Sequence, residues 1–346
     1  MSLITNYEPV VVTDTTNLSE QEWLEYRRKG IGGSDAAAVL GLSPFCTSRD
    51  LYYDKIGVKP VIGEEQNYVA KQVGKLLEPL VGEIFSRKTG LKIYREAKLY
   101  SHPLYPFMLA NIDYIVAMPD GTLAVLECKT TNYNNQDKWA NGAVPINYEL
   151  QGRHYMPVRN VNTVFFACLY GNSENEFVYR RIDRDMDYEQ DIIEQERYFW
   201  EEHVQKKIVP PYTENGNLVL ESIRRKYGNA DASAPVINID GNMAEIIERY
   251  LALREQKLEF DHKSQDIEDE MKKAYAPILD IMGSNCSAVC LSGSSEYLIT
   301  YNPSYRESIN KDGLEALKVF NPEIYKKYIS TTESRRFAVK KKGLAA

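Results

Sequence analysis

The sequence lacks several features that define large classes of protein. It contains five cysteines, an odd and scattered number, which excludes a disulfide framework and indicates reduced thiols. Its longest apolar runs, such as residues 161–170, are too short and too polar to cross a bilayer. The first residues lack the basic and apolar segments of a secretory signal. We therefore expect a cytoplasmic protein that does not associate with membranes.

Excess positive charge is also missing. The formal net charge is −7, which argues against binding of nucleic acid over the whole surface, because such binding needs a basic field. A local binding track remains open, because basic residues cluster at residues 27–29, 224–226, 335–336 and 340–342. Most such clusters are ordinary solvated surface.

The order of periodic segments predicts an α/β fold with a mixed central sheet flanked by helices. Helices come first, followed by a strand hairpin, a helix, two strands and a further helix. A charged helix and a small terminal module follow. The expected divisions are a flexible arm at 1–18, a main domain at 19–210, a linker at 211–242 rich in Asn, Gly, Ala, Ser and Pro, and a C-terminal helix with a small module at 243–346.

The main chemical signal lies in residues 108–130. Two apolar runs joined by a Pro-Asp-Gly turn predict a β-hairpin, and both runs contain charged residues. Asp113 and Glu127 would lie on adjacent strands and could share a hard divalent cation. Lys129 lies two residues beyond Glu127 and therefore on the same face of its strand. The pattern is typical of a metal-dependent nuclease.

An ordinary ion pair between Glu127 and Lys129 on a solvated face is the alternative. The preceding run, residues 123–126, is continuously apolar, as expected of a strand covered on both sides. Ionisable groups buried at the end of such a strand are costly unless they are paired or bind a metal. This setting favours the metal site.

Glu78 lies within a helix predicted over residues 68–88, whose apolar residues indicate a long core-facing helix. Pro79 follows it and would kink the helix at this point. Glu78 is therefore either an exposed glutamate on a bent helix or a third acidic residue of the metal site.

A glycine-rich turn at residues 30–33 precedes a short Ala-rich helix. Ser34 is a good N-cap, and the free amides of such a helix start can hold an anion. A plain corner between two helices is the alternative. No strand precedes the turn, so it is not a dinucleotide-binding motif.

With these motifs in order, the chain resembles the YqaJ-like viral recombinase family of lambda exonuclease-like PD-(D/E)XK nucleases, over residues 19–205. The resemblance implies a restriction-endonuclease-like core. It also implies that Asp113, Glu127 and the backbone carbonyl of Cys128 hold Mg²⁺, with Mn²⁺ as a substitute. Lys129 would position or activate the attacking water, Glu78 would support the metal site, and Gln151 would orient it. The segment with Arg27, Ser34 and Asp35 would receive the terminal 5′-phosphate of DNA.

The implied activity is Mg²⁺-dependent 5′-to-3′ digestion of double-stranded DNA, which leaves 3′ single-stranded tails for recombination by strand annealing. Implied partners are double-stranded DNA ends, a single-strand annealing protein and further copies of the chain in a trimer. The implied source is a phage or prophage of a bacterial host. Two alternatives stay open: a non-catalytic protein that binds DNA ends on the same fold, and a structure-specific endonuclease.

Overall fold

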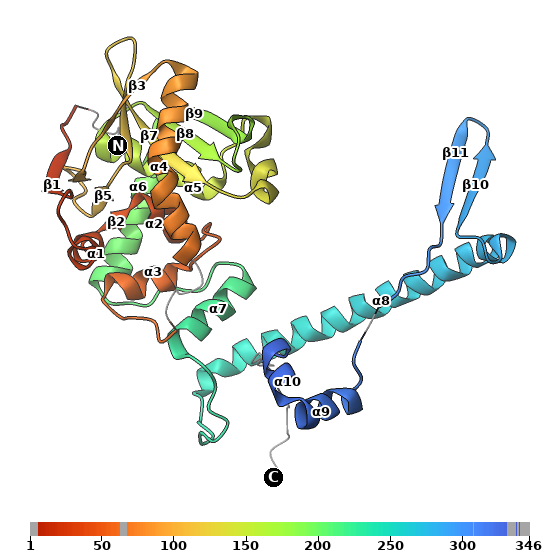
Figure 1. The fold of residues 1–346 in the computed structure, drawn as a ribbon. Coiled ribbons are helices and arrows are strands. Elements are labelled where there is room, and N and C mark those ends of the chain that lie inside the picture. Colours follow the sequence, from red (N-terminus) through yellow and green to blue (C-terminus); the bar gives the residue numbers. More distant parts are fainter. Residues whose placement is uncertain (1–5, 63–67, 307, 331–336, 338, 340–346) are drawn as a thin grey trace. The chain divides into compact units, whose positions relative to one another are not determined.

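The computed structural model describes residues 6–62, 68–306, 308–330, 337 and 339 (Figure 1). The chain divides into two compact units, Met1–Ala230 and Asp231–Ala346, called here the N-terminal and C-terminal units. The basic residues at 335–336 and 340–342 lie outside the described residues. In the part of the chain that is described, no helix is both long and apolar enough to span a membrane.

A five-stranded sheet forms the centre of the N-terminal unit, with strand order β3-β6-β7-β8-β9. Strands β7 and β8 run parallel, and the other neighbours run antiparallel. The strands are β3 (Lys92–Arg95), β6 (Tyr114–Ala117), β7 (Leu123–Thr130), β8 (Thr163–Leu169) and β9 (Phe177–Asp183). The expected mixed α/β class is therefore confirmed, and so is the hairpin of β6 and β7.

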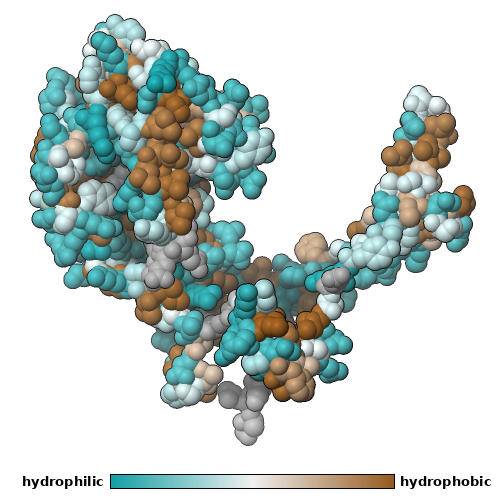
Figure 2. All heavy atoms as spheres, viewed as in Figure 1, coloured by the Kyte–Doolittle hydropathy of each residue, from teal (hydrophilic) through white to brown (hydrophobic). Residues whose placement is uncertain are grey.

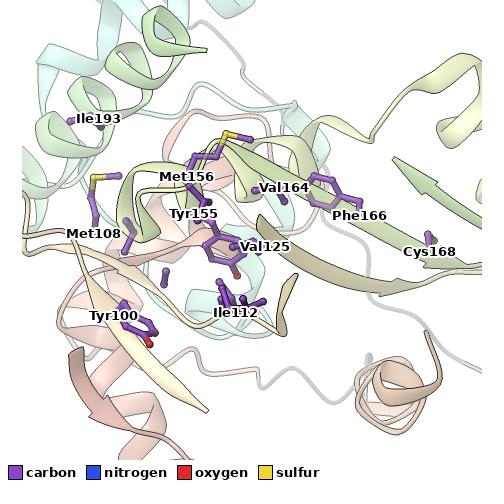
Figure 3. Packing of buried hydrophobic residues seen from close by; sticks show 14 of the residues in the cluster. Tyr100, Met108, Ile112, Val125, Tyr155, Met156, Val164, Phe166, Cys168 and Ile193 are labelled. Carbon is purple, nitrogen blue, oxygen red and sulfur yellow. The ribbon is translucent and has the colours of Figure 1, made fainter. Parts of the chain in front are cut away.

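Helices cover both faces of this sheet. On one face α4 (Tyr68–Thr89) packs Val81 and Phe85 against a cluster that includes Leu126. On the other face α5 (Ile146–Arg159) contributes Tyr155 to a cluster that includes Val125, as Figure 3 shows. Side chains alternate along a strand, so the residues of β7 that share the α5 face with Val125 are residues 127 and 129. The hydrophobic pattern thus turns Glu127 and Lys129 toward α5.

A second, four-stranded sheet has the order β1-β4-β5-β2. Its strands are β1 (Val10–Asp14), β2 (Ile31–Gly32), β4 (Lys98–Ser101) and β5 (Met108–Ala110). Strand β1 pairs antiparallel with β4, so the expectation of a loose arm is wrong for these residues. A short strand whose three valines are exposed, and which pairs with a segment far along the chain, gives no alternating signal of its own. The run at 108–115 also differs from expectation, because it is split into β5 and β6, which belong to different sheets.

Helix α4 also differs from what the sequence predicted. Its C-terminal half is core-facing as predicted, but its N-terminal half exposes an apolar face, seen over α4 in Figure 2. The exposed residues include Val69 at 72% and Leu76 at 75%. Periodicity identifies an apolar face but does not show what covers it, which explains the error.

The expected linker at 211–242 contains a helix, α7 (Gly216–Tyr227), which belongs to the N-terminal unit. Arg225 and Ser222 of α7 bind Asp50 of α3 at 2.7 and 2.9 Å. The polar composition that predicted a linker therefore serves long-range polar contacts, and only the segment after α7 connects the two units.

The remaining helices of the N-terminal unit are α1 (Glu20–Arg28), α2 (Gly33–Val39), α3 (Ser48–Lys55) and α6 (Met186–Tyr198), which continues into a π-helical segment at Phe199–Gln205. A capping box begins α1, since Ser19 and Glu22 bind each other's backbone amides. The C-terminal unit contains α8 (Ala244–Met282), β10 (Ser287–Ser292), β11 (Ser295–Thr300), α9 (Lys311–Phe320) and α10 (Pro322–Tyr328).

Candidate active site

Three predicted site residues form one hydrogen-bonded group at the end of β7. The Lys129 ammonium lies 2.7 Å from Glu127 Oε1 and donates to Gln151 Oε1 at 2.9 Å. The Gln151 amide Nε2 donates to the same Glu127 oxygen at 2.6 Å. Gln151 comes from α5, which covers this face of the sheet. The helix therefore fixes the side chains that the strand presents.

Close packing of α5 on β8 brings Gln151 into position. Residue 152 is glycine, and a Cβ there would lie 2.5 Å from the ring of Phe166. Any larger residue would push α5 away from the sheet. The glycine after Gln151 therefore allows the approach that places Gln151 beside Glu127.

Asp113 lies at the break between β5 and β6, directly before β6. Its Oδ2 accepts a hydrogen bond of 2.8 Å from the backbone N–H of Cys128. Since Cys128 lies between Glu127 and Lys129, this bond holds the Asp113 carboxylate next to the end of β7. The backbone break that was not foreseen is what frees Asp113 to turn toward β7.

The burial and charge of the two carboxylates indicate whether the site fits a cation. Burial raises the pKa of Asp113 well above its usual value, and the neighbouring Glu127 charge raises it further. Glu127 is only 5% exposed, and its Oε2 has no hydrogen-bond partner among the described residues. A buried carboxylate oxygen without a partner is costly, and two hard oxygen ligands side by side suit Mg²⁺. The residues present therefore fit a divalent metal.

The predicted ligand set contains two acidic side chains, Asp113 and Glu127, and one backbone carbonyl, that of Cys128. No group of three or more His, Cys, Asp or Glu side chains within the described ranges could hold a metal. Glu78 lies near enough for its charge to raise the pKa of Asp113, but its own contact is a 3.5 Å ion pair with Arg95. The structure therefore does not bring Glu78 into the group, and a direct metal-binding role for it stays a prediction.

The predicted phosphate-binding residues form a second group. Arg27 donates to Ser34 Oγ at 2.6 Å and pairs with Asp35 Oδ1 at 2.5 Å. Asp35 also pairs with the fully buried Lys55 at 2.7 Å. Burial alone would raise the pKa of Asp35, but Arg27 and Lys55 lower it well below its usual value. Asp35 is thus a buried anion that positions Arg27, and its charge makes it unsuited to contact phosphate itself.

One cavity of about 210 Å³ joins the two groups. Its walls include Arg27 and Ser34 from the first group and Asp113, Glu127 and Gln151 from the second. The sequence analysis treated these motifs as separate. The structure places them around a single space, so one molecule could contact both.

Tyr155 links the two groups, and sequence reasoning gave it no role. Its hydroxyl accepts from Gln151 Nε2 at 2.9 Å and donates to the Asn111 carbonyl at 3.2 Å. Its ring packs so closely on Gly33 that a Cβ there would lie 2.4 Å away. The spacing of four residues between Gln151 and Tyr155 on a helix could have indicated this pairing. Lys55 offered no such signal.

Asn111 lines the same cavity and was also missed. Its side-chain oxygen is buried and has no partner among the described residues. A larger hollow of about 410 Å³, lined by residues that include Tyr94, Lys98 and Arg159, contains none of the predicted site residues. The smaller cavity is therefore the one that matters for chemistry.

The chain is similar to several known proteins. The YqaJ-like viral recombinase domain matches residues 22–162. The chain is 30% identical over 340 residues to "Uncharacterized protein YqaJ" of Bacillus subtilis (strain 168), covering 97% of this chain and 99% of that protein. Similar solved structures include an alkaline exonuclease (LHK-Exo) from Laribacter hongkongensis, at 18% identity with a TM-score of 0.45, covering 54% of this chain and 93% of that one. Another is a phage-related exonuclease from Haemophilus somnus 129PT, at 10% identity with a TM-score of 0.38, covering 54% of this chain and 100% of that one. Since the match to the Bacillus protein extends over nearly the whole of both chains, the chain belongs to the YqaJ-like viral recombinase family.

Proposed function

We propose that the protein is a Mg²⁺-dependent exonuclease that digests double-stranded DNA from its 5′ ends and leaves 3′ single-stranded tails for strand annealing. The observation that carries this proposal is the shared cavity. Its walls include two carboxylates, Asp113 and Glu127, the second of which binds Lys129, and they also include Arg27 with the Ser34 hydroxyl. The first set suits phosphodiester hydrolysis, and the second suits a terminal phosphate.

The hydrolytic side depends on Asp113, Glu127 and the carbonyl of Cys128, which would hold the divalent metal. When bound, a metal of this kind polarises the phosphoryl oxygen and lowers the pKa of a bound water. Lys129 keeps a positive charge beside Glu127, where it would orient the water and offset the charge that develops on the phosphate. Gln151 holds both side chains through its amide and thereby limits their motion.

Arg27 would explain why the enzyme selects the end of a DNA duplex. Arg27 is one-third exposed, while its guanidinium is fixed by Asp35 and Ser34. A guanidinium held in this way is preorganised to bind a phosphate through charge-assisted hydrogen bonds. A terminal phosphate has one more ionisable oxygen than an internal one, so a fixed cation would favour chain ends.

The same proposal includes the partners implied by the family. The family is described as viral recombinases, and the two similar structures are those of exonucleases. The 3′ tails that an exonuclease leaves are substrates for a single-strand annealing protein. We propose that the enzyme acts in the cytoplasm of a bacterial host as a homo-oligomer, with a trimer as the expected form. Light scattering of the purified chain measures that stoichiometry.

A comparison of DNA substrates tests the function. Linear duplex with 5′-phosphates, linear duplex with 5′-hydroxyls and covalently closed duplex are each incubated with the protein, with and without Mg²⁺. We expect digestion of the linear 5′-phosphorylated duplex only when Mg²⁺ is present, with release of mononucleotides and 3′ tails. Cleavage of closed duplex would identify an endonuclease instead. Binding of ends without any digestion would identify a non-catalytic end-binding protein.

A further inference from the structure

Helix α8 carries an apolar stripe with a regular spacing. Successive positions are separated alternately by four and three residues along its 39 residues. Nine of these eleven positions are apolar; they are Ile246, Tyr250, Leu253, Phe260, Ile267, Met271, Ala274, Ile278 and Ile281, and Lys257 and Ser264 occupy the other two. These eleven positions are called here the α8 seam. A mean spacing of 3.5 residues is the period of a helix that supercoils around another helix.

Most of the α8 seam is exposed among the described residues of the chain; Tyr250, which packs edge-on against Phe337, is half-buried. Leu253 is 54% exposed, Phe260 is 69% exposed and Ile281 is 88% exposed. Among the described residues of the C-terminal unit, Met282 alone is buried. Long helices in water depend on packing of their apolar face. The exposure therefore indicates that another molecule covers the seam.

The length of the seam limits what can cover it. From residue 246 to residue 281 it extends about 52 Å along the helix, at about 1.5 Å per residue. In the described part of the chain, the next longest helix is α4, with 22 residues. Among the described helices of this chain, only α8 itself, supplied by a second copy, has the length and the matching spacing to cover the whole seam.

The charges of α8 favour a protein partner over DNA. The helix contains ten acidic and six basic residues, so a phosphate backbone would be repelled. Two of its basic residues lie on the flanks of the seam in the N-terminal half, Arg249 and Arg254, while the flanks of the C-terminal half carry Glu268 and Glu270. Flanking charges set the orientation of paired helices.

The middle of the helix modifies this charge pattern only slightly. Asp261 and Lys263 also lie on the flanks of the N-terminal half, and their charges cancel. The N-terminal flanks are therefore net positive and the C-terminal flanks net negative. Antiparallel pairing of two α8 helices places these opposite charges together, whereas parallel pairing places like charges together.

We propose that two copies of the chain associate through an antiparallel coiled coil of their α8 helices. The seam forms the core of this pair, with Leu253, Phe260 and Ile267 among its buried residues. The pairing is isologous, so it doubles whatever assembly the N-terminal units form. The proposal stands apart from the catalytic assignment, because the seam contains no residue of the candidate active site.

Light scattering of the full chain tests the pairing. The seam variant is Phe260→Glu with Ile267→Glu, and the matched control is His262→Glu with Ala276→Glu, which adds the same charge on the opposite face of the helix. We expect the control to keep the wild-type mass and the seam variant to have half of it. Loss of two buried apolar anchors weakens association by roughly a hundredfold or more. Equal masses for wild type and seam variant, or a monomeric wild type, would overturn the proposal.

A distance measurement tests the orientation. After the exposed Cys286 and Cys290 are replaced by serine, a spin label is attached through Glu245→Cys at the start of α8. Antiparallel pairing places the two labels about 50 Å apart, which is the length of the helix. A short distance between labels, on the order of 10 Å as for adjacent parallel helices, would show parallel pairing and overturn the antiparallel arrangement.

Discussion

The two units of this chain use their apolar residues in opposite ways. The N-terminal unit buries them in clusters on both faces of its five-stranded sheet. In the C-terminal unit, Met282 at the end of α8 is the only buried residue among those described, and most other apolar residues of α8 lie exposed. The first unit can therefore position the side chains of the candidate site by itself, whereas we propose that the second gains its apolar packing from another molecule.

Burial of charge differs between the units in the same way. In the N-terminal unit the buried carboxylates Asp35 and Glu127 each bind a lysine, and both lie at the candidate site. Ion pairs on α8 are exposed neighbours along one helix, such as Lys257 with Asp261. Exposed pairs of this kind contribute little to stability. The candidate active site and these buried ion pairs lie in the N-terminal unit, so substitutions there should have the larger effects on activity and stability.

Among residues other than the two carboxylates, loss of the Lys129 charge should give the largest change in activity. We expect Lys129→Met to lower the rate of Mg²⁺-dependent digestion by about 10²- to 10⁴-fold, the usual range for a group that assists proton transfer. The circular dichroism spectrum should stay unchanged. Lys206→Met, which removes a solvent-exposed ion pair with Glu202, is the control and should retain nearly full activity. Full activity of Lys129→Met would remove it from the site.

Asp35 should matter most for stability. Asp35→Asn leaves the fully buried Lys55 without its carboxylate partner, which typically costs about 3–5 kcal/mol of unfolding free energy. Asp54→Asn, at the exposed ion pair with Arg28, is the control and should change it by less than about 1 kcal/mol. Denaturant titration measures both. Equal losses of unfolding free energy in the two variants would show that the Asp35 carboxylate stabilises the protein no more than an exposed carboxylate does.

The pH dependence of this contribution follows from the lowered pKa of Asp35. Its ordinary value is 3.8, and the native value lies below it. The stabilisation is therefore fully present above the ordinary value and is lost as the pH falls from 3.8 toward the native pKa. The stability difference between wild type and Asp35→Asn should be constant near neutral pH and should narrow only below 3.8.

Substitution of Arg27 separates recognition of the terminal phosphate from hydrolysis within the N-terminal unit. We expect Arg27→Ala to lower digestion of 5′-phosphorylated duplex roughly tenfold more than digestion of 5′-hydroxyl duplex, since one charge-assisted contact is lost on the first substrate only. Arg28→Ala is the adjacent control, because Arg28 pairs with Asp54 instead. Equal losses on both substrates would exclude recognition of the terminal phosphate by Arg27.

Tyr155 should show the smallest effect. Tyr155→Phe removes the hydroxyl that joins Gln151 to the Asn111 carbonyl, and one such hydrogen bond is worth about 1 kcal/mol, or roughly fivefold in rate. The loss should appear in kcat and not in KM, because the residue positions Gln151. Tyr179→Phe, on the exposed side of β9, is the control. A change in KM alone would assign Tyr155 to substrate binding.

Local signals predicted the parts of the site that depend on local spacing. The alternation along β7 placed Glu127 and Lys129 on one face, and the turn at 119–121 predicted the hairpin that the structure contains. The order of periodic segments also predicted the mixed α/β class. These features need only the period of a strand and the chemistry of a turn.

Contacts between distant segments could not be predicted. The break before β6 that turns Asp113 toward β7, the pairing of β1 with β4, and the docking of α7 on α3 all depend on partners far along the chain. The single cavity shared by the two motifs also depends on contacts between distant segments. Periodicity also could not show that the N-terminal half of α4 is exposed.

Digestion assays on two carboxylate variants test the central claim most directly. Wild type, Asp113→Ala and Glu127→Ala are compared on linear 5′-phosphorylated duplex with Mg²⁺, and calorimetry measures Mg²⁺ binding to each. We expect both variants to fold, to bind Mg²⁺ more weakly than wild type and to show no digestion. Wild-type digestion by either folded variant, or unchanged Mg²⁺ binding in both, would contradict it.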